Sequence, residues 1–560
     1  MTKNKYFYPS LAALIGFLVA IQVVGPLLFN ENVVQDDFRQ SMFWAWRFWD
    51  PSLFPDDFIA NLYSGSFDRL PLLWMIYAIA PFLTKSLIFY TKFAAIILAA
   101  LTSVFGFLFF DKLSSNKILS LAFTAAFATM LWCTDHLSVM YARSFIWIFI
   151  IAVGYFKLRG KDHWASITTL ISLFISPIAF LICFALQGFD LLLNYRQELF
   201  DLKSLKLRWL LINVAIVILV YKVIPWTTAN LPFADSEWYS VDELKQLPEF
   251  LPGGRHPIFG SSLWDGSWFN NEHWGLGIGF LPISDILVWA MGFAIVGFVM
   301  YRKRYKVTEL LTSIPACLLY ASLALYIAAQ ILFPLLYMPS RFLGIPLLII
   351  ALVIIFLIGE VLLQDLVNTF AGKALTERAK ASFLSILIIV GTIGFWFYFT
   401  RPQRQYTRYV TMNAQTAEIY KKLPKDAMVA AHPLLPDINL ASAIAKRSVF
   451  MSYEHSTPSF NKQVLAEVRR RNEDSLKMVY AQSAQELREL MEKNHITHVA
   501  AFAGFYSPQY LAKPKYIQPY MGLLRDLTSK EDFYLWKFLK KTKSSYALFT
   551  EKSFELMEKN

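Results

Sequence analysis

Long apolar segments constrain this chain more than any other feature of its sequence. The first, from Leu11 to Phe29, carries no charged residue and approaches the roughly 20 residues that a helix needs to cross a hydrocarbon core of about 30 Å. Each later segment is apolar and flanked by charged or aromatic residues, which is typical of membrane-spanning helices. These segments lie near residues 92–110, 118–135, 144–158, 208–225, 284–300, 310–333, 341–359 and 382–400.

Composition supports the same interpretation. Of the 560 residues, 56% are hydrophobic and the mean hydropathy is +0.42, whereas a soluble fold of this size needs far more polar surface. The first apolar segment is longer than the core of a cleavable signal peptide, and Asn30-Glu31-Asn32 offers no small-residue cleavage site. We therefore expect a retained anchor that leaves the N-terminus in the cytoplasm.

Two segments allow two interpretations. Residues 71–90 form either a span or a helix in the outer membrane interface, and residues 164–193 form either one span or two short ones broken at Ser176-Pro177. Both interpretations give about eleven spans. Because cytoplasmic loops carry an excess of Lys and Arg, an interfacial 71–90 with a broken 164–193 is favoured by five charges against three. The charges then inside are Lys112, Lys117, Lys157, Arg159 and Lys161, and those outside are Lys85, Lys92 and Arg143.

The loops and the end of the chain indicate two domains. Basic clusters at 196–208 and 302–306 belong in the cytoplasm, so residues 226–283 form a large external loop. After residue 400 the sequence turns polar, with 25 Lys and Arg against 16 Asp and Glu. We expect a transmembrane helix bundle over residues 1–400, with a first external loop at 30–91, and a soluble extracytoplasmic domain over residues 401–560.

The polar C-terminal segment mixes the patterns of strands and helices. Short β-prone runs occur at 427–431 and 498–502, and helical stretches occur at 459–472 and 483–494. This alternation predicts a small α/β fold. The fold class expected for the whole chain is therefore mainly α, a polytopic bundle followed by an α/β domain.

Two adjacent acids follow the first span. Asp36-Asp37 lies a few residues beyond the outer membrane face, where carboxylates are costly to desolvate unless they pair with cations or a metal. The segment from Trp44 to Trp49 is aromatic and partly basic, which suits a position in the interface. A second pair, Asp56-Asp57, comes next. A solvated acidic loop and a functional site both fit this pattern.

This arrangement resembles the GT-C superfamily of polytopic membrane glycosyltransferases. In that superfamily the first span leads into a long external loop with interfacial helices, and an Asp near the start of the loop is catalytic. Members include oligosaccharyltransferases, protein O-mannosyltransferases and aminoarabinose transferases, which take sugar from a polyprenyl-phosphate carrier. By position, the resemblance implies that Asp36 or Asp37 is the catalytic acid. It would act as general base on an acceptor hydroxyl, in a single displacement that inverts the anomeric centre.

The departing phosphate is anionic, so the same chemistry needs a cation, and a guanidinium fork is well shaped for it. Arg143, in the segment 140–145, resembles part of a superfamily motif between the third and fourth spans. Arg341, in the segment 337–342, resembles an Arg before a late span of many members. We expect both to bind the donor phosphate. The alternative is that each one only snorkels to the interface as a span anchor.

Three further residues are candidates for a second acid or a metal ligand, namely Asp135, Glu272 and His273. Some superfamily members use a divalent cation, so a divalent metal is a candidate cofactor. The sequence departs from the oligosaccharyltransferases, because its first acid is Asp-Asp without their separated Asp-x-Asp and it has no Trp-Trp-Asp signature. This departure argues against N-glycan transfer and leaves the acceptor open.

The sequence thus predicts a glycosyltransferase of the cytoplasmic membrane that moves a sugar from a polyprenyl-phosphate donor to an extracytoplasmic acceptor. The expected partners are that donor, membrane lipids and an envelope glycan, lipid or protein; nucleic acid is not expected. A transporter or flippase for lipid-linked saccharides is one alternative, although transporters more often show two related halves and charges at mid-membrane. A non-catalytic envelope assembly protein is the other.

Overall fold

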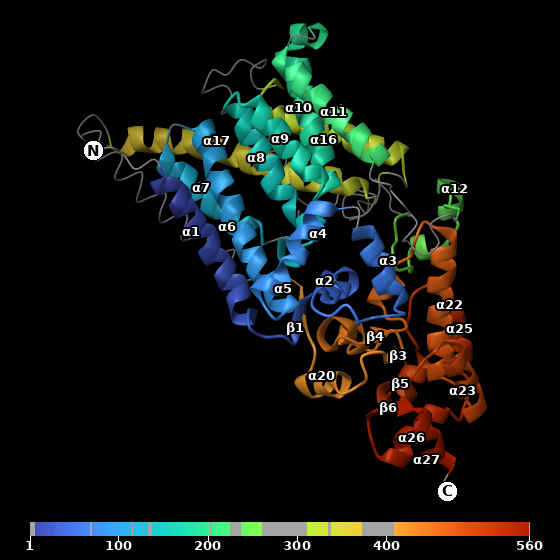
Figure 1. The fold of residues 1–560 in the computed structure, drawn as a ribbon. Coiled ribbons are helices and arrows are strands. Elements are labelled where there is room, and N and C mark those ends of the chain that lie inside the picture. The colour runs from blue at the N-terminus through green and yellow to red at the C-terminus, as the bar shows by residue number, and fades with distance from the viewer. Residues whose placement is uncertain are drawn as a thin grey trace.

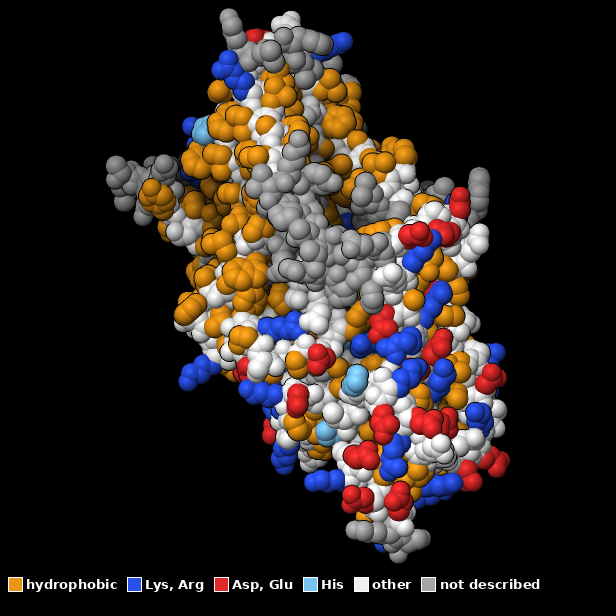
Figure 2. Space-filling model, turned by 45° about the vertical axis from the view of Figure 1, so that its right-hand side comes forward, with side chains coloured by type: hydrophobic (Ala, Val, Ile, Leu, Met, Phe, Trp, Pro, Cys, Tyr) orange, Lys and Arg blue, Asp and Glu red, His pale blue; other side chains and the backbone are white. Residues whose placement is uncertain are grey.

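Figure 1 shows the fold of the chain in a computed structural model. The structure describes residues 6–67, 70–114, 116–132, 137–201, 204–223, 237–259, 311–333, 336, 338–371 and 408–558. Apolar helices occupy the upper part of the view, and the C-terminal region lies below them (Figure 1). Hydrophobic side chains gather over the helices, and Lys, Arg, Asp and Glu gather over the C-terminal region (Figure 2). The predicted fold class, mainly α with a C-terminal α/β region, is confirmed, and the predicted boundary near residue 400 lies outside the described residues.

Among the described residues, five helical segments are long and apolar enough to cross a membrane. α1 (Phe7–Val24) packs along α6 (Leu87–Leu113), and Gly16 permits their close approach, since a Cβ there would lie 2.3 Å from Oγ of Ser103. The others are α10 (Pro177–Asn194), α16 (Ile314–Ile331) and Pro339–Val361, which comprises η9 (Pro339–Phe342) and most of α17 (Gly344–Ala371). The remaining bundle helices are α7 (Lys117–Met130), α8 (Ile146–Leu158), α9 (Asp162–Leu173) and α11 (Leu205–Val223). The total of eleven spans stays a prediction, because the expected spans at 284–300 and 382–400 lie outside the described residues.

Both ambiguous segments are divided into shorter helices, while the interfacial position of residues 71–90 stays a prediction. Residues 71–90 begin with two short helices, α4 (Pro71–Ala78) and α5 (Ala80–Leu83), before α6 starts at Leu87. Residues 164–193 are divided between α9 and α10, and the break falls at Ser176-Pro177. Pro177 occupies the first turn of α10, where its missing N–H costs no helical hydrogen bond.

The C-terminal region is an α/β unit with a four-stranded sheet in the order β4-β3-β5-β6. β3 (Met428–Ala431) pairs in parallel with β4 (Ser448–Val449) and β5 (His498–Phe502), and β6 (Tyr546–Thr550) is antiparallel to β5. The predicted strands at 427–431 and 498–502 are therefore present, as are the two predicted helices, now α22 (Lys462–Val479) and α23 (Ala484–Lys493). The other helices are α20 (Ala414–Lys421), α21 (Ile438–Leu440), η10 (Ala441–Ala445), η11 (Glu454–Ser456), η12 (Ala503–Tyr506), α24 (Pro508–Ala512), α25 (Met521–Thr528), α26 (Tyr534–Thr542) and α27 (Glu551–Glu558).

The two parts are joined directly after the first span. β1 (Val33–Gln35) pairs with β2 (Tyr409–Thr411) in an antiparallel register that sets Val34 opposite Val410. The first loop continues through α2 (Asp36–Ser41), η2 (Phe43–Phe48) and α3 (Phe58–Phe67). Trp46 of η2 is buried, and its Nε1 donates to the carbonyl of Ala443, 2.8 Å away. The first loop therefore lies between the bundle and the α/β unit (Figure 1).

The described part of the predicted external loop, residues 237–259, lies against the α/β unit. It contains α12 (Val241–Leu244) and η7 (Pro248–Phe250). Glu249 is buried and accepts two hydrogen bonds from the Arg469 guanidinium, at 2.5 and 2.8 Å. The backbone N–H of Gln518 donates to the carbonyl of Gly253 at 3.0 Å. This loop segment is thus attached to the C-terminal region at several points.

Candidate active site

The two predicted acids open helix α2, directly after strand β1. The side-chain oxygen of Gln35 caps this helix by accepting the N–H groups of Asp37 at 2.7 Å and Phe38 at 3.2 Å. The N–H of Asp36 donates to the carbonyl of Arg408 at 2.9 Å, which continues the contact between β1 and β2. The backbone of the acids is therefore fixed from both sides, by their own cap and by the C-terminal region.

Each acid pairs with a different arginine. Asp36 forms an ion pair with Arg39, one turn later on α2, and Asp37 forms one with Arg143. The side chains of Asp36 and Asp37 are 22% and 27% exposed, so both are partly accessible. The structure thus brings together three residues that the sequence predicted for the site, Asp36, Asp37 and Arg143, and Arg39 balances the remaining negative charge.

Arg143 lies in a single turn, η4 (Ala142–Phe145), immediately before α8. The side chain of Tyr141, directly before this turn, is partly buried. Burial raises the pKa of this phenol, and the positive charge of Arg341 opposes that rise. Arg341, in η9 at the start of a predicted span, is therefore within electrostatic range of the segment that carries Arg143.

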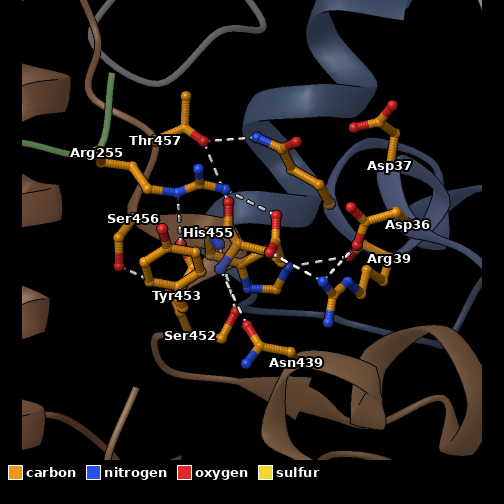
Figure 3. A network of polar contacts seen from close by, with 12 residues as sticks. Asp36, Asp37, Arg39, Arg255, Asn439, Ser452, Tyr453, His455, Ser456 and Thr457 are labelled. Atoms are coloured by element: carbon orange, nitrogen blue, oxygen red, sulfur yellow. Dashed lines mark hydrogen bonds and ion pairs between the residues drawn. The ribbon is translucent and has the colours of Figure 1, made fainter. Parts of the chain in front are cut away.

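A chain of alternating charges continues from Asp36 into the C-terminal region (Figure 3). Nη2 of Arg39 lies 2.9 Å from Oε1 of Glu454, in η11, and Oε2 of Glu454 lies 2.8 Å from Nη2 of Arg255. We call Asp36, Arg39, Glu454 and Arg255 the charge chain. It joins three parts of the sequence that lie far apart: helix α2, the α/β unit and the external loop.

Two further contacts hold α2 against η11. Nε2 of His455 donates to the carbonyl of Arg39 at 3.3 Å, and Nε2 of Gln40 donates to the hydroxyl of Thr457 at 2.5 Å (Figure 3). The His455 ring is buried, and this burial lowers its pKa to about 4, so the ring is neutral at pH 7. Helix α2, which carries the two acids, is therefore held against the C-terminal region by hydrogen bonds.

The sequence did not identify Arg39, Glu454 or Arg255 as site residues. Arg39 carried a usable signal, because a cation three residues after an acid on a helix lies on the same face. Glu454 and Arg255 carried none, since each reaches the site only through the packing of a distant segment.

The second acidic pair has a different environment from the first. Asp57 is fully buried and accepts the N–H groups of Ala60 at 2.9 Å and Val449, of β4, at 3.3 Å. Burial raises its pKa, which the nearby Arg471 and Arg47 oppose. Asp56, by contrast, is exposed. Asp57 therefore ties the first loop to the sheet and is closed to substrate.

Three predicted site residues, Asp135, Glu272 and His273, lie outside the described residues. Within the described part of the chain, no group of three or more His, Cys, Asp or Glu side chains could hold a metal ion. Both carboxylates of the acidic pair face guanidinium groups, which would repel a divalent cation. A divalent metal therefore stays a prediction, because its candidate ligands Asp135, Glu272 and His273 lie outside the described residues.

No protein-family model and no curated protein sequence matches the chain. Solved structures of an oligosaccharyltransferase from Archaeoglobus fulgidus are similar to it. The apo form has a TM-score of 0.48 and 12% identity, covering 91% of this chain and 71% of the other. The form tethered with an acceptor peptide has a TM-score of 0.48 and 12% identity, covering 91% and 70%. The complex with an inhibitory peptide and a dolichol-phosphate has a TM-score of 0.37 and 13% identity, covering 91% and 71%. At these identities and TM-scores, the similarity does not assign an activity to this chain.

Proposed function

We propose that the protein is a glycosyltransferase of the GT-C type, which moves a sugar from a polyprenyl-phosphate donor to an acceptor outside the cytoplasm. One observation carries most weight: two adjacent carboxylates on α2 each face a different guanidinium, and α2 lies between the apolar helices and the C-terminal region (Figure 1). A boundary site of this kind suits a donor whose lipid tail stays in the bilayer while its sugar phosphate reaches water.

The carboxylates and arginines can divide the chemistry between them. The acceptor oxygen bonds to the anomeric carbon while the bond from that carbon to the phosphate oxygen breaks. The acceptor proton passes to Asp36 or Asp37 as general base, and the polyprenyl phosphate leaves with the electron pair. Arg143, together with Arg341, would stabilise the negative charge that develops on the phosphate. Such a single displacement inverts the anomeric centre.

The ion pair between Asp37 and Arg143 gives the site a way to respond to the donor. A phosphate bound by Arg143 competes with Asp37 for the same guanidinium. Once the guanidinium turns to the phosphate, the carboxylate of Asp37 has less compensation for its charge and becomes more basic. Donor binding would therefore make the Asp37 carboxylate a stronger base when the acceptor hydroxyl has to lose its proton.

The pairing of β1 with β2 bears on sidedness. β1 follows α1 directly, so the acidic pair and the C-terminal region lie on the same side of the membrane. The excess of Lys and Arg in the loops at 196–208 and 302–306 then favours an N-terminus in the cytoplasm, with the acids, the large loop and the C-terminal domain outside. We infer a cytoplasmic membrane location and an acceptor that is an envelope glycan, lipid or protein. The metal candidates Asp135, Glu272 and His273 enter no step of this scheme.

Transfer by the purified protein tests the proposal. A panel of radiolabelled polyprenyl-phosphate sugars and envelope acceptors would be offered to the wild type, Asp36→Asn and Asp37→Asn, with Asp56→Asn as an exposed control from the same loop. We expect one of the first two substitutions to abolish transfer and the control to retain it.

Two results would contradict this function. If no donor is consumed, and both variants of the acidic pair support normal growth, a non-catalytic assembly protein is favoured. If labelled lipid crosses a vesicle membrane with its sugar phosphate bond intact, the protein is a flippase.

A further inference from the structure

We propose that Glu454 is a positioning residue: together with Arg255, it sets how the Arg39 guanidinium is shared with Asp36, and so tunes the basicity of that acid. This inference rests on the proposed function, because it concerns the same acidic pair. It adds a role for the C-terminal domain and the external loop, neither of which contains a predicted base or phosphate ligand among the described residues.

The sharing is visible at a single nitrogen atom. Nη2 of Arg39 forms the ion pair with Asp36 and also lies 2.9 Å from Oε1 of Glu454. The exposed fractions of the Arg39 and Glu454 side chains are only 14% and 10%, so water screens this contact poorly. The Arg39 guanidinium thus interacts with two carboxylates at once. A change in the charge of Glu454 therefore alters how strongly Arg39 stabilises the charged form of Asp36.

Glu454 is itself held firmly by the α/β unit. Its N–H donates to the side-chain oxygen of Asn439 at 3.0 Å, and its carbonyl accepts from the Thr457 hydroxyl at 3.2 Å. The amide of Asn439 donates to the carbonyl of Leu435 at 3.2 Å, which fixes the amide in turn. Glu454 therefore presents its carboxylate to Arg39 from a rigid support, as a positioning group requires.

Arg255 completes the charge balance from the other side. Its Nε donates to the carbonyl of Tyr453 at 3.2 Å, and its guanidinium lies 4.2 Å from the centre of the Tyr453 ring. Because Glu249 and Gly253 bind the same loop to the α/β unit, Arg255 reaches Glu454 from a segment that is already attached. Figure 3 shows Arg255 and Arg39 on opposite sides of the η11 segment.

Simple electrostatics gives opposite signs for two substitutions. Glu454→Gln removes a negative charge near Asp36 and leaves Arg39 to Asp36 alone, so this acid becomes less basic. Arg255→Gln removes the cation that compensates Glu454, so Glu454 draws Arg39 more strongly and Asp36 becomes more basic. A residue that only supports the fold would not produce shifts of opposite direction.

The test measures kcat, KM for the lipid-linked donor and the pH profile of kcat with the purified full-length protein. Glu454→Gln is expected to lower kcat about tenfold, the scale typical of groups that orient a reacting side chain, with KM within about twofold. Its acidic limb should move to lower pH, and that of Arg255→Gln to higher pH. The matched control is Glu467→Gln, since Glu467 likewise bridges two arginines, Arg470 and Arg471, without touching the charge chain. Its profile should equal that of the wild type.

The outcomes separate this inference from the function on which it rests. If the wild type transfers sugar, the positioning role is wrong and the function stands in either of two cases: Asp36→Asn also transfers sugar, or the profiles of Glu454→Gln and Arg255→Gln stay in place or move together. If the melting temperature shows that Glu454→Gln does not fold, the Arg255→Gln variant alone tests the inference: an acidic limb at higher pH supports the positioning role, and an unmoved limb contradicts it. If the wild type transfers no sugar from any donor, both proposals fall.

Discussion

Arg143 forms an ion pair with Asp37, although the two residues belong to different loops, one after the first helix and one before α8. If Arg143 also binds the donor phosphate, its loss should remove charge stabilisation that develops mainly in the transition state. We expect Arg143→Met to lower kcat about 10²- to 10³-fold. The kcat of Arg143→Lys should lie between those of the wild type and Arg143→Met, because lysine keeps the positive charge but lacks the planar guanidinium with its paired donors. Turnover of Arg143→Met within twofold of the wild type would show that Arg143 only anchors its helix.

Asp57→Ala should destabilise the protein without acting on the chemistry. The substitution leaves the buried N–H groups of Ala60 and Val449 without their acceptor. The expected loss is about 3 kcal/mol of unfolding free energy. Thermal unfolding in detergent checks this, with the exposed Asp56→Ala as control. Equal melting temperatures for the two variants would contradict the structural role of Asp57.

Lys92→Met should loosen the end of the first span. The ammonium group of Lys92 donates to the carbonyls of Leu27 and Asn30, each at 2.7 Å, and so caps the chain just before β1. We expect a loss of about 2 kcal/mol, because hydrogen bonds to a charged group are lost while the volume is kept. The exposed Lys85→Met is the matched control for a melting-temperature measurement. Unchanged melting in Lys92→Met would mean that water replaces the cap at no cost.

The C-terminal domain should become less stable as the pH falls below about 6.5. Burial lowers the pKa of His432 to about 3 and that of His455 to about 4, from an ordinary value of 6.5. Between about pH 4 and 6.5 the unfolded chain thus binds more protons than the folded one, and each histidine costs up to about 1.4 kcal/mol per pH unit. Melting temperatures measured from pH 7.5 down to 4.5 should fall more steeply for the wild type than for His455→Gln. Parallel curves would mean that His455 is protonated in the folded state.

The parts of the fold that depend on local composition could be predicted from the sequence. Long apolar runs give membrane helices, and Ser176-Pro177 breaks one of them because the proline ring suits only a helix start. The strands at 427–431 and 498–502 were also evident, because their residues favour a buried sheet.

Long-range pairing could not be predicted in this way. β1 and β2 have three residues each, too few to carry a periodic signal, yet their pairing fixes the acidic helix. The acidic pairs Asp36-Asp37 and Asp56-Asp57 look alike in sequence, and only packing separates the open pair from the buried Asp57. Glu454 likewise lies near the acidic pair only because of long-range packing, which the sequence does not reveal.

The pairing of β1 with β2 also determines when the site can form during synthesis of the chain. A ribosome completes the acidic helix almost at once, but the strand beside that helix emerges only after nearly three quarters of the chain has been synthesised. Throughout that interval the acids lack the backbone and the glutamate that later hold them in place. Nascent and truncated chains therefore lack part of the site, because the last domain supplies both the strand that pairs with β1 and the glutamate that contacts Arg39.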